Sequence, residues 1–273
     1  MSAIAELAED RIVEGTYAVA RKERRRTKSG AAYLALELVD PSGRIDARVW
    51  QDVELLDGRF REGDAVRLLG RVERFRDRLQ VEVRSLETAD VDPAGLVPTM
   101  RRDADELDGF LDFLVAELSH AGLRQAVGHV LDGRVRERMR QLPAAETHHS
   151  YAGGLLEHTV GVATLCREAA QLHQRLRSDL VLAAAVLHDV GRTLELRPGP
   201  GFAATEEGAL LGHVHLGMRL VEERAGALEL GARAELLHAI ACHHDARSAR
   251  TAEAAVLYHA NQLDAAAATR PAG

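Results

Sequence analysis

Residues 179–192 of the chain read DLVLAAAVLHDVGR. This run is almost entirely apolar until it reaches His188-Asp189, and Gly191 then supplies a helix stop. Ionisable side chains beside so apolar a run must be paired, hydrogen-bonded or bound to metal, because an isolated charge in a protein core is costly. The stretch therefore predicts a buried helix that carries a polar site at its C-terminal end.

Three other apolar segments carry histidine in the same way. They are GGLLEHTVGVATLC with His158, ALLGHVHLG with His213, and LLHAIACHHD with His243-His244. Each histidine taken singly is more often a core or surface residue than a ligand. Four segments together offer imidazole, however, and imidazole with carboxylate suits Mn²⁺, Fe²⁺, Zn²⁺ or Ni²⁺. All 13 histidines lie at or after His120, so this chemistry belongs to the second part of the chain.

The second part of the chain has helical periodicity throughout. A stripe of apolar residues from Leu107 to Leu118 predicts the first amphipathic helix. Composition changes near Asp92-Pro93, which places a linker at 91–103 and an all-α domain at 104–273. Further helices are predicted at about 121–140, 154–173, 179–190, 208–225, 230–242 and 252–267.

The first part of the chain, residues 10–90, has the alternation of β-strands. Apolar and polar residues alternate on either side of the turn Asp40-Pro41-Ser42-Gly43, which predicts a hairpin. With the runs at 12–20, 66–74 and 79–84, the pattern indicates about five short strands. Such a count suits a small closed barrel, because closure leaves no exposed sheet edge.

Composition limits the class of protein. The 273 residues are 46% hydrophobic and 28% charged, with a net charge of −7, which excludes a disordered chain and a chain that coats nucleic acid along its whole length. No apolar run reaches the ~20 residues of a bilayer span. The N-terminus carries acids where a secretory signal would carry basic residues. We therefore expect a cytoplasmic protein that does not enter a membrane.

The order and spacing of the histidine segments resemble those of HD-domain metal-dependent phosphohydrolases. The closer resemblance is to one branch, the YhaM-type 3′-to-5′ exoribonucleases, in which an N-terminal OB-fold precedes an HD domain. The resemblance implies a multidomain chain of α and β structure, with an OB-fold β-barrel followed by an all-α HD domain. The segments that carry it are PAAETHHSYAGGLLEHT at 143–159, LLGHVHLG at 210–217, LLHAIACHH at 236–244 and ALELVDPSGRIDARVW at 35–50.

The resemblance also implies a centre of two divalent ions, with Mn²⁺ as the first choice and Co²⁺, Fe²⁺ or Zn²⁺ as alternatives. Asp189 would bridge the ions, which together activate water for in-line attack on a phosphodiester. Arg192 would stabilise charge on the phosphoryl oxygens. One ion would be held by His158, His188 and either Asn261 or Asp264, and the other by His213, His243 and His244.

Two positions depart from the family pattern. Arg192 stands where lysine usually follows the HD doublet. Arginine keeps the positive charge, but its guanidinium is planar whereas the lysine ammonium is a point charge. Asn261 stands where an aspartate ligand is usual, and it offers a carbonyl oxygen without negative charge. Asp264 lies three residues further and shares a helical face with Asn261. It is expected either to replace Asn261 as a ligand or to support the site from behind.

By the same resemblance, the barrel is expected to hold single-stranded RNA or DNA. Arginine and lysine would contact phosphates, and aromatic rings would stack on bases. For Tyr33 and Trp50, simple packing within the barrel is the alternative. The expected contacts are Arg24, Arg26, Lys28, Tyr33, Trp50, Phe75, Arg76 and Arg78.

These features predict a metal-dependent 3′-to-5′ exonuclease that hydrolyses phosphodiester bonds of single-stranded RNA, with DNA as a further substrate. Two alternatives stay open. One is an HD-domain phosphohydrolase acting on nucleotides or cyclic dinucleotides, and the other is a catalytically weakened nucleic-acid-binding module. A homo-oligomer is compatible with each of them.

Overall fold

The computed structural model describes residues 2–226 and 228–269, which form two compact units. The first unit contains the chain up to Thr99 together with Pro198–Ala203, and the second contains Met100–Arg197 and the chain from Ala204 onward. The division after Thr99 falls within the linker predicted at 91–103. Within the described ranges, no helix has both the length and the apolar character needed to cross a membrane.

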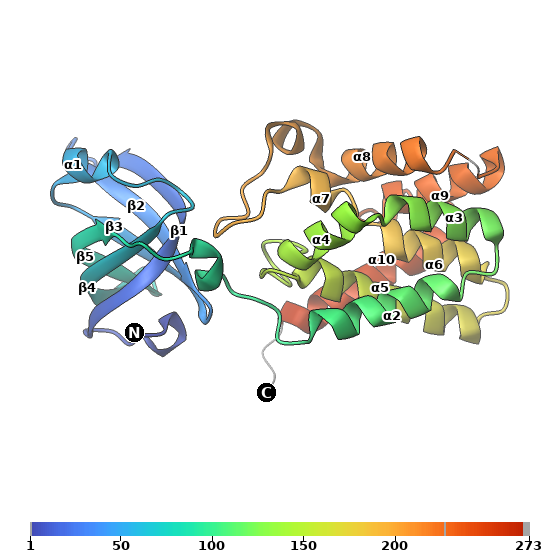
Figure 1. Cartoon of the computed structure of the whole chain (residues 1–273), viewed down its shortest axis with the longest axis horizontal. Coiled ribbons are helices and arrows are strands. Elements are labelled where there is room, and N and C mark those ends of the chain that lie inside the picture. Colours follow the sequence, from blue (N-terminus) through green and yellow to red (C-terminus); the bar gives the residue numbers. More distant parts are fainter. Residues whose placement is uncertain (1, 227, 270–273) are drawn as a thin grey trace. The chain divides into compact units, whose positions relative to one another are not determined.

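Five strands close into a barrel in the first unit, in the order β1-β2-β3-β5-β4 (Figure 1). Neighbouring strands are antiparallel except β3 and β5, which run parallel. The predicted barrel and the predicted hairpin, which is β2 and β3, are therefore confirmed. The elements are η1 (Ile4–Glu6), β1 (Ile12–Arg26), β2 (Ala32–Asp40), β3 (Gly43–Val49), α1 (Val53–Asp57), β4 (Ala65–Phe75), β5 (Arg78–Thr88) and η2 (Pro93–Leu96).

Strand β1 is longer than the strand predicted at 12–20 because it pairs on both sides. Its first half, as far as Ala18, pairs with β4, and its second half pairs with β2. The register with β2 shifts between Val19 and Arg21. A bulge of this kind bends a strand and increases its twist. A single strand can thereby reach both neighbours and close the barrel.

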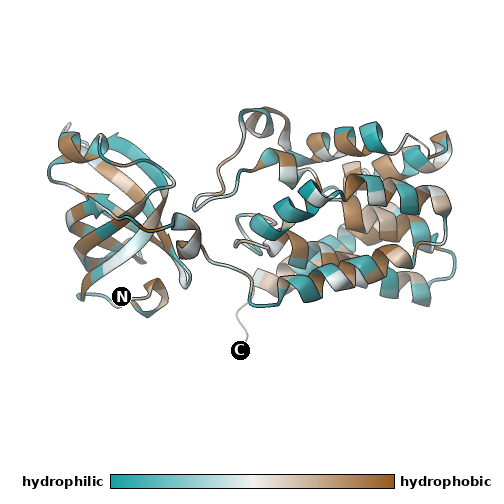
Figure 2. Ribbon diagram, viewed as in Figure 1, coloured by the Kyte–Doolittle hydropathy of each residue, from teal (hydrophilic) through white to brown (hydrophobic). Residues whose placement is uncertain are grey.

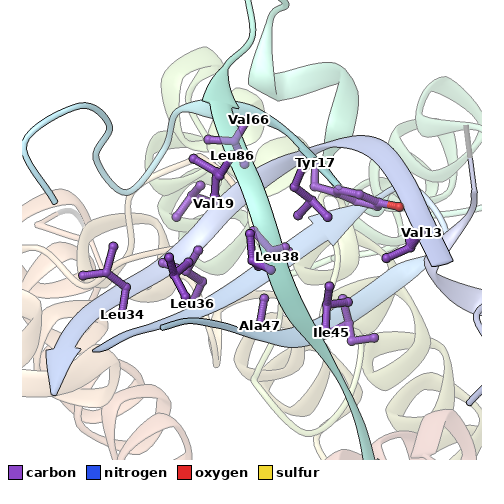
Figure 3. Packing of buried hydrophobic residues seen from close by; sticks show 14 of the residues in the cluster. Val13, Tyr17, Val19, Leu34, Leu36, Leu38, Ile45, Ala47, Val66 and Leu86 are labelled. Carbon is purple, nitrogen blue, oxygen red and sulfur yellow. The ribbon is translucent and has the colours of Figure 1, made fainter. Parts of the chain in front are cut away.

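Aliphatic side chains from all of the strands fill the barrel interior (Figure 3). On β2, Leu34, Leu36 and Leu38 alternate along the strand and are each at most 1% exposed. Alternate residues of a strand point to one face, so these three side chains lie inside the barrel. Tyr17 of β1 is also buried, and its hydroxyl donates to the carbonyl of Ser2 (2.8 Å).

The second unit is helical, and the only β-bridge among its described residues joins Leu196 and Ala204. The helices predicted at 154–173, 230–242 and 252–267 are confirmed as α5, α9 and α10. The helices of this unit are α2 (Ala104–Ala116), α3 (Ala121–Val130), α4 (Gly133–Gln141), α5 (Gly154–Leu172), α6 (Ser178–Leu187), α7 (Arg192–Glu195), α8 (Glu206–Arg224), α9 (Leu230–Cys242) and α10 (Ala252–Thr269).

The single helix predicted at 121–140 is wrong, because the chain forms two helices there. Helix α3 ends at Val130, and Leu131 leaves the helical conformation. The side chain of Asp132 then accepts a hydrogen bond from the amide of Val135 (2.8 Å) and caps α4. A capping aspartate inside an otherwise helical pattern was the local signal for this break.

Helix α6 is the buried centre of the second unit. Every residue from Leu180 to Leu187 is buried, and the helix packs against α3, α5, α9 and α10. A helix covered on all sides is apolar all round, which accounts for the composition of the 179–192 stretch. The amphipathic α2, by contrast, carries hydrophobic and hydrophilic residues in alternation (Figure 2).

Helix α8 contains a break at Gly212, where φ is +71° and ψ is 161°. This backbone conformation is essentially restricted to glycine. The helix predicted at 208–225 therefore consists of two helical pieces, and His213 begins the second piece. The break frees the backbone amide of His213 from the helical hydrogen-bond ladder.

The barrel core can be tested with the fluorescence of Trp50, the only tryptophan of the chain. Leu36 is 1% exposed, so Leu36→Ala should lower the free energy of unfolding of the barrel by about 2–5 kcal/mol. The measurement is denaturant unfolding followed by tryptophan fluorescence. Leu55→Ala on α1, where leucine is 55% exposed, is the control and should shift the midpoint little. Equal shifts for the two variants would contradict the assignment of this core.

Candidate metal centre

The centre is assembled from the ends and interiors of four helices. His158 lies within α5, His188 and Asp189 directly follow α6, His213 begins the second piece of α8, and His243 and His244 directly follow α9. Their ligand atoms converge in two groups that share Asp189 and within which all atoms lie within 4.8 Å of one another. The first group is His158, His188 and Asp189; the second is Asp189, His213, His243 and His244.

The protons on three of these imidazoles are fixed by hydrogen bonds on the far side of each ring. Nδ1 of His188 donates to the carbonyl of Ala185 (2.7 Å), and Nδ1 of His243 donates to the carbonyl of Ile240 (2.6 Å). Nδ1 of His158 lies 2.6 Å from a carboxylate oxygen of Asp264 and donates to it. A neutral imidazole with its proton on Nδ1 presents a lone pair on Nε2. All three Nε2 atoms are therefore acceptors or ligands.

These lone pairs face other acceptors. Nε2 of His158 lies 3.2 Å from Nε2 of His188, and Nε2 of His243 lies 3.4 Å from Oδ1 of Asp189. Both Nε2 of His243 and Oδ1 of Asp189 are buried without a hydrogen-bond partner in the described chain. Acceptors that converge without a donor require a cation between them. The residues present thus fit a bound divalent metal.

Asp189 divides its two carboxylate oxygens between the two groups. Oδ2 lies 3.7 Å from Nε2 of His188 and 3.9 Å from Nε2 of His158. Oδ1 lies 3.3 Å from Nε2 of His213 and 3.4 Å from that of His243. A carboxylate in this position can bridge two cations. The second group includes the exposed His244, so it is the group that opens to solvent.

The surroundings of His188 and His244 favour the neutral form of imidazole, which is the form that binds metals. Burial lowers the pKa of His188 to about 3, and partial desolvation beside His243 lowers the pKa of His244 to about 4. Burial alone would raise the pKa of Asp189, but the neighbouring His188 and Arg192 hold that pKa well below its usual value. At neutral pH, His188 and His244 are therefore neutral and Asp189 is ionised.

Two glycines allow α8 to bring His213 close to Asp189. A side chain at Gly191 would meet the carbonyl of His213 at 1.9 Å, so only glycine fits where α8 crosses this turn. The break at Gly212 frees the amide of His213, which donates to Glu195 Oε1 (3.1 Å). The same oxygen lies 3.6 Å from Nδ1 of His213. Glu195 thus holds both the backbone and the ring of this histidine.

The two residues expected to complete the first group have different surroundings. Asn261 is 2% exposed, and its Nδ2 donates to the carbonyl of His243 (3.2 Å). Asp264 Oδ2 contacts Nδ1 of His158 and lies 2.9 Å from Nε2 of His149. Asp264 thus contacts the His158 ring on the side away from Asp189.

Arg192, the expected phosphate contact, is bound to a neighbouring acid. Its Nη1 donates to Glu195 Oε2 (2.7 Å), and its Nε lies 3.9 Å from Oδ1 of Asp189. The guanidinium therefore lies beside the second group but is shared with Glu195. Sequence reasoning missed Glu195, because no motif marks it and only the turn after Asp189 brings it back to the centre.

A hydrogen-bond chain behind His158 was also missed. Asp264 accepts from His149, whose Nδ1 lies 2.8 Å from the hydroxyl of Tyr151. That hydroxyl donates to Glu157 (2.9 Å). His149, Tyr151 and Glu157 all lie in the family-like segment 143–159, which was the available signal for them. The chain fixes the orientation of Asp264 and, through it, of His158.

The residues expected to bind nucleic acid lie on the barrel. The rings of Tyr33 and Trp50 are 4.7 Å apart and inclined by 30°, and Trp50 is 43% exposed. Phe75 is 55% exposed and precedes the β4–β5 turn, where Arg76 and Asp77 both have positive φ, as a two-residue hairpin turn requires.

The basic residues of this set differ in their partners. Arg24 forms ion pairs with Glu54 and Asp57, and Arg26 donates to the carbonyl of Gly30 (3.1 Å). Lys28, Arg76 and Arg78 are exposed and form no ion pair with the residues that the structure describes. The charges of these three side chains are therefore not neutralised by a carboxylate of the described residues.

Comparisons with known proteins agree with this arrangement. An HD domain family matches residues 155–266, and an OB-fold nucleic acid binding domain family matches residues 18–89. The HD match covers the His/Asp groups described above, which supports divalent metal binding. The 3′-5′ exoribonuclease YhaM of Bacillus velezensis is 27% identical over 249 residues, which are 87% of this chain and 79% of that protein.

Solved structures with a similar barrel include the second OB-fold domain of replication protein A from Methanococcus maripaludis, at 21% identity and a TM-score of 0.28 over 33% of this chain and 96% of that one. Another is the single-stranded DNA binding protein from Thermus aquaticus, at 24% identity and a TM-score of 0.27 over 30% and 41%. The chain is thus similar to the YhaM exoribonuclease over most of its length, and it matches an OB-fold family and an HD domain family in that order.

Proposed function

We propose that the chain is a metal-dependent 3′-to-5′ exonuclease that hydrolyses phosphodiester bonds of single-stranded RNA. One observation carries the proposal: the buried carboxylate of Asp189 faces the Nε2 atoms of His158, His188 and His243, whose protons are held on Nδ1 by other partners. The relative named as a 3′-5′ exoribonuclease supports the direction and the substrate class.

Asp189 would hold two divalent ions, one through each carboxylate oxygen. Bound there, the ions would neutralise phosphate charge and make an attacking water more acidic. His158 and His188 would hold one ion, and His213, His243 and His244 the other. Nitrogen and carboxylate ligands suit Mn²⁺, our first choice, as well as Co²⁺, Fe²⁺ and Zn²⁺.

The remaining residues of the centre would orient these ligands. Asp264 accepts the Nδ1 proton of His158, and the carbonyls of Ala185 and Ile240 accept those of His188 and His243. Oε1 of Glu195 accepts a hydrogen bond from the amide of His213, and its Oε2 accepts one from Arg192. A guanidinium held beside Asp189 would stabilise negative charge on the phosphoryl group in the transition state.

The barrel would bind the single strand across β2 and β3, the face that OB-folds use together with their β1–β2 and β4–β5 loops. Tyr33 belongs to β2 and Trp50 directly follows β3, whereas Lys28 lies in the first loop and Arg76 lies in the second. Val49, which precedes Trp50, pairs with Val83 of β5. Arg78 lies five residues before Val83 on the same strand, a distance of about 16 Å. This span suits a strand of several nucleotides.

The cytoplasmic location and the homo-oligomeric state stay predictions.

The nuclease activity is tested with a 5′-labelled single-stranded RNA and Mn²⁺. Progressive shortening from the 3′ end should occur, and EDTA should stop it. Loss of a residue that only hydrogen-bonds to a metal ligand typically lowers activity about 10–100-fold. His188→Ala removes a ligand itself, so it should lower the rate by more than this. His173→Ala, at the exposed end of α5, is the matched control and should keep the wild-type rate. Intact RNA together with hydrolysis of a cyclic dinucleotide would instead support the nucleotide phosphohydrolase.

The role of Asp264 is tested by metal content. Asp264→Asn should weaken binding of one of two ions by about 10–100-fold, because His158 loses the carboxylate that fixes its tautomer. Titration of the metal-stripped protein with Mn²⁺, followed by elemental analysis, gives the stoichiometry and the affinities. Asp112→Asn on the exposed face of α2 is the control. Unchanged affinity in Asp264→Asn would exclude a supporting role.

The buried imidazoles also predict acid sensitivity of the metal-free protein. Unfolded His188 has a pKa near 6.5, whereas burial lowers the folded pKa to about 3. Between these values unfolding takes up a proton, so the free energy of unfolding should fall as pH falls. At pH 4.5 this one residue should cost about 2–3 kcal/mol. Thermal unfolding in EDTA from pH 7 to 4.5 measures it, and His188→Asn should flatten the dependence. An equally steep slope in both proteins would refute it.

A further inference from the structure

A cavity with several arginines in its wall lies in the helical unit, away from the ligands of Asp189. It has a volume of about 270 Å³ and lies among α4, α7 and α8 and the chain that joins α7 to α8. None of the histidines of the candidate metal centre lines it. The lining residues are Arg134, Val135, Arg138, Thr193, Leu194, Arg197, Thr205, Leu220 and Arg224.

The cavity wall carries four arginines and no acid. Arg224 is neutralised by Asp132 (2.7 Å), which lies outside the lining. For Arg134, Arg138 and Arg197, no carboxylate lies within 4.0 Å among residues 2–226 and 228–269. Three positive charges therefore surround a small space without a negative partner.

The arginine side chains are also only partly satisfied by hydrogen bonds. Arg138 donates from Nη2 to the carbonyl of Leu196, and Arg197 donates to the carbonyl of Ala204 (3.1 Å). Nε of Arg138 is buried and has no partner in the described chain. Burial and the charge of Arg134 lower the pKa of Arg138, as expected for cations held close together. An anion in the cavity would satisfy both the charge and the free donor.

We propose that this cavity binds the terminal phosphate of a small phosphorylated ligand. Guanidinium groups match phosphate oxygens with paired hydrogen bonds, which makes arginine the usual residue for this anion. A phosphate monoester carries close to two negative charges, which balances three unpaired cations better than the single charge of an internal phosphodiester. The volume of about 270 Å³ lies just below the 300–1,000 Å³ of typical small-molecule sites, so the cavity has room for a phosphate group rather than for a large ligand. The site is independent of the proposed nuclease activity.

The cavity lies directly behind the turn that carries part of the metal centre. Thr193 and Leu194 of α7 line the cavity, whereas Arg192 and Glu195 of the same short helix contact Asp189 and His213. Binding must therefore be measured with metal removed, so that phosphate does not bind through ions at the centre. The two sites can then be separated by variants that touch only one of them.

The test is calorimetric titration of the full metal-stripped chain, in EDTA and chloride buffer, with inorganic phosphate and with adenosine 5′-monophosphate. The wild type should bind at least one of the two. Arg134→Gln and Arg138→Gln should each weaken binding at least tenfold. Arg134 is exposed and unpaired, so its variant should fold normally even if Arg138→Gln does not. Arg219→Gln on α8, where arginine pairs with Glu207 outside the cavity, should bind like the wild type.

Tighter binding of the nucleotide than of phosphate would identify a mononucleotide as the ligand, and equal affinity would identify the phosphate group alone. A third arm compares an oligonucleotide bearing a 5′-phosphate with its 5′-hydroxyl form. A preference for the phosphate form that Arg134→Gln removes would identify a strand end as the source. The proposal is overturned if the wild type binds none of these probes, or if Arg134→Gln binds them as tightly as the wild type.

Discussion

The carboxylate of Asp189 is a buried negative charge that faces the unprotonated Nε2 atoms of His158, His188 and His243. Burying an ion among acceptors is costly, so cations between the carboxylate and the rings would stabilise this arrangement. The reason is the position of the protons on the imidazole rings. They are held on Nδ1 by Ala185, Ile240 and Asp264, each on the far side of its ring.

Helix ends make this arrangement easy to build. The last carbonyls of a helix have no partner within it, and His188 and His243 each follow a helix and donate to a carbonyl three residues earlier. Adjacent residues within a helix point about 100° apart. Because α6 and α9 both end before their polar doublets, both members of each doublet can face the centre. Two helices thus use the same local geometry to present His188-Asp189 and His243-His244.

Local pattern predicted the elements well and their long-range contacts poorly. Alternation gave the strands of the barrel, and the apolar run at 179–192 gave both α6 and the position of the polar doublet. The break at Gly212 was not predicted, because a glycine inside a helical pattern is usually tolerated. Glu195 and the Asp264–His158 pair depend on contacts across 18 and 106 residues. Periodicity does not encode such contacts, although family-like spacing brought the histidines together correctly.

Asparagine at position 261 is consistent with its neighbours in a way that aspartate is not. Its Nδ2 donates to the backbone carbonyl of His243. An ionised aspartate has no proton to donate, so its carboxylate oxygen would repel this carbonyl oxygen. The amide therefore stabilises the turn that presents His243 to Asp189. Asp264 supplies the negative charge on this side of the centre, but through the Nδ1 proton of His158. A carboxylate hydrogen-bonded to Nδ1 raises the basicity of the imidazole ligand. Asp264 therefore compensates in part, through His158, for the negative charge that Asn261 does not supply.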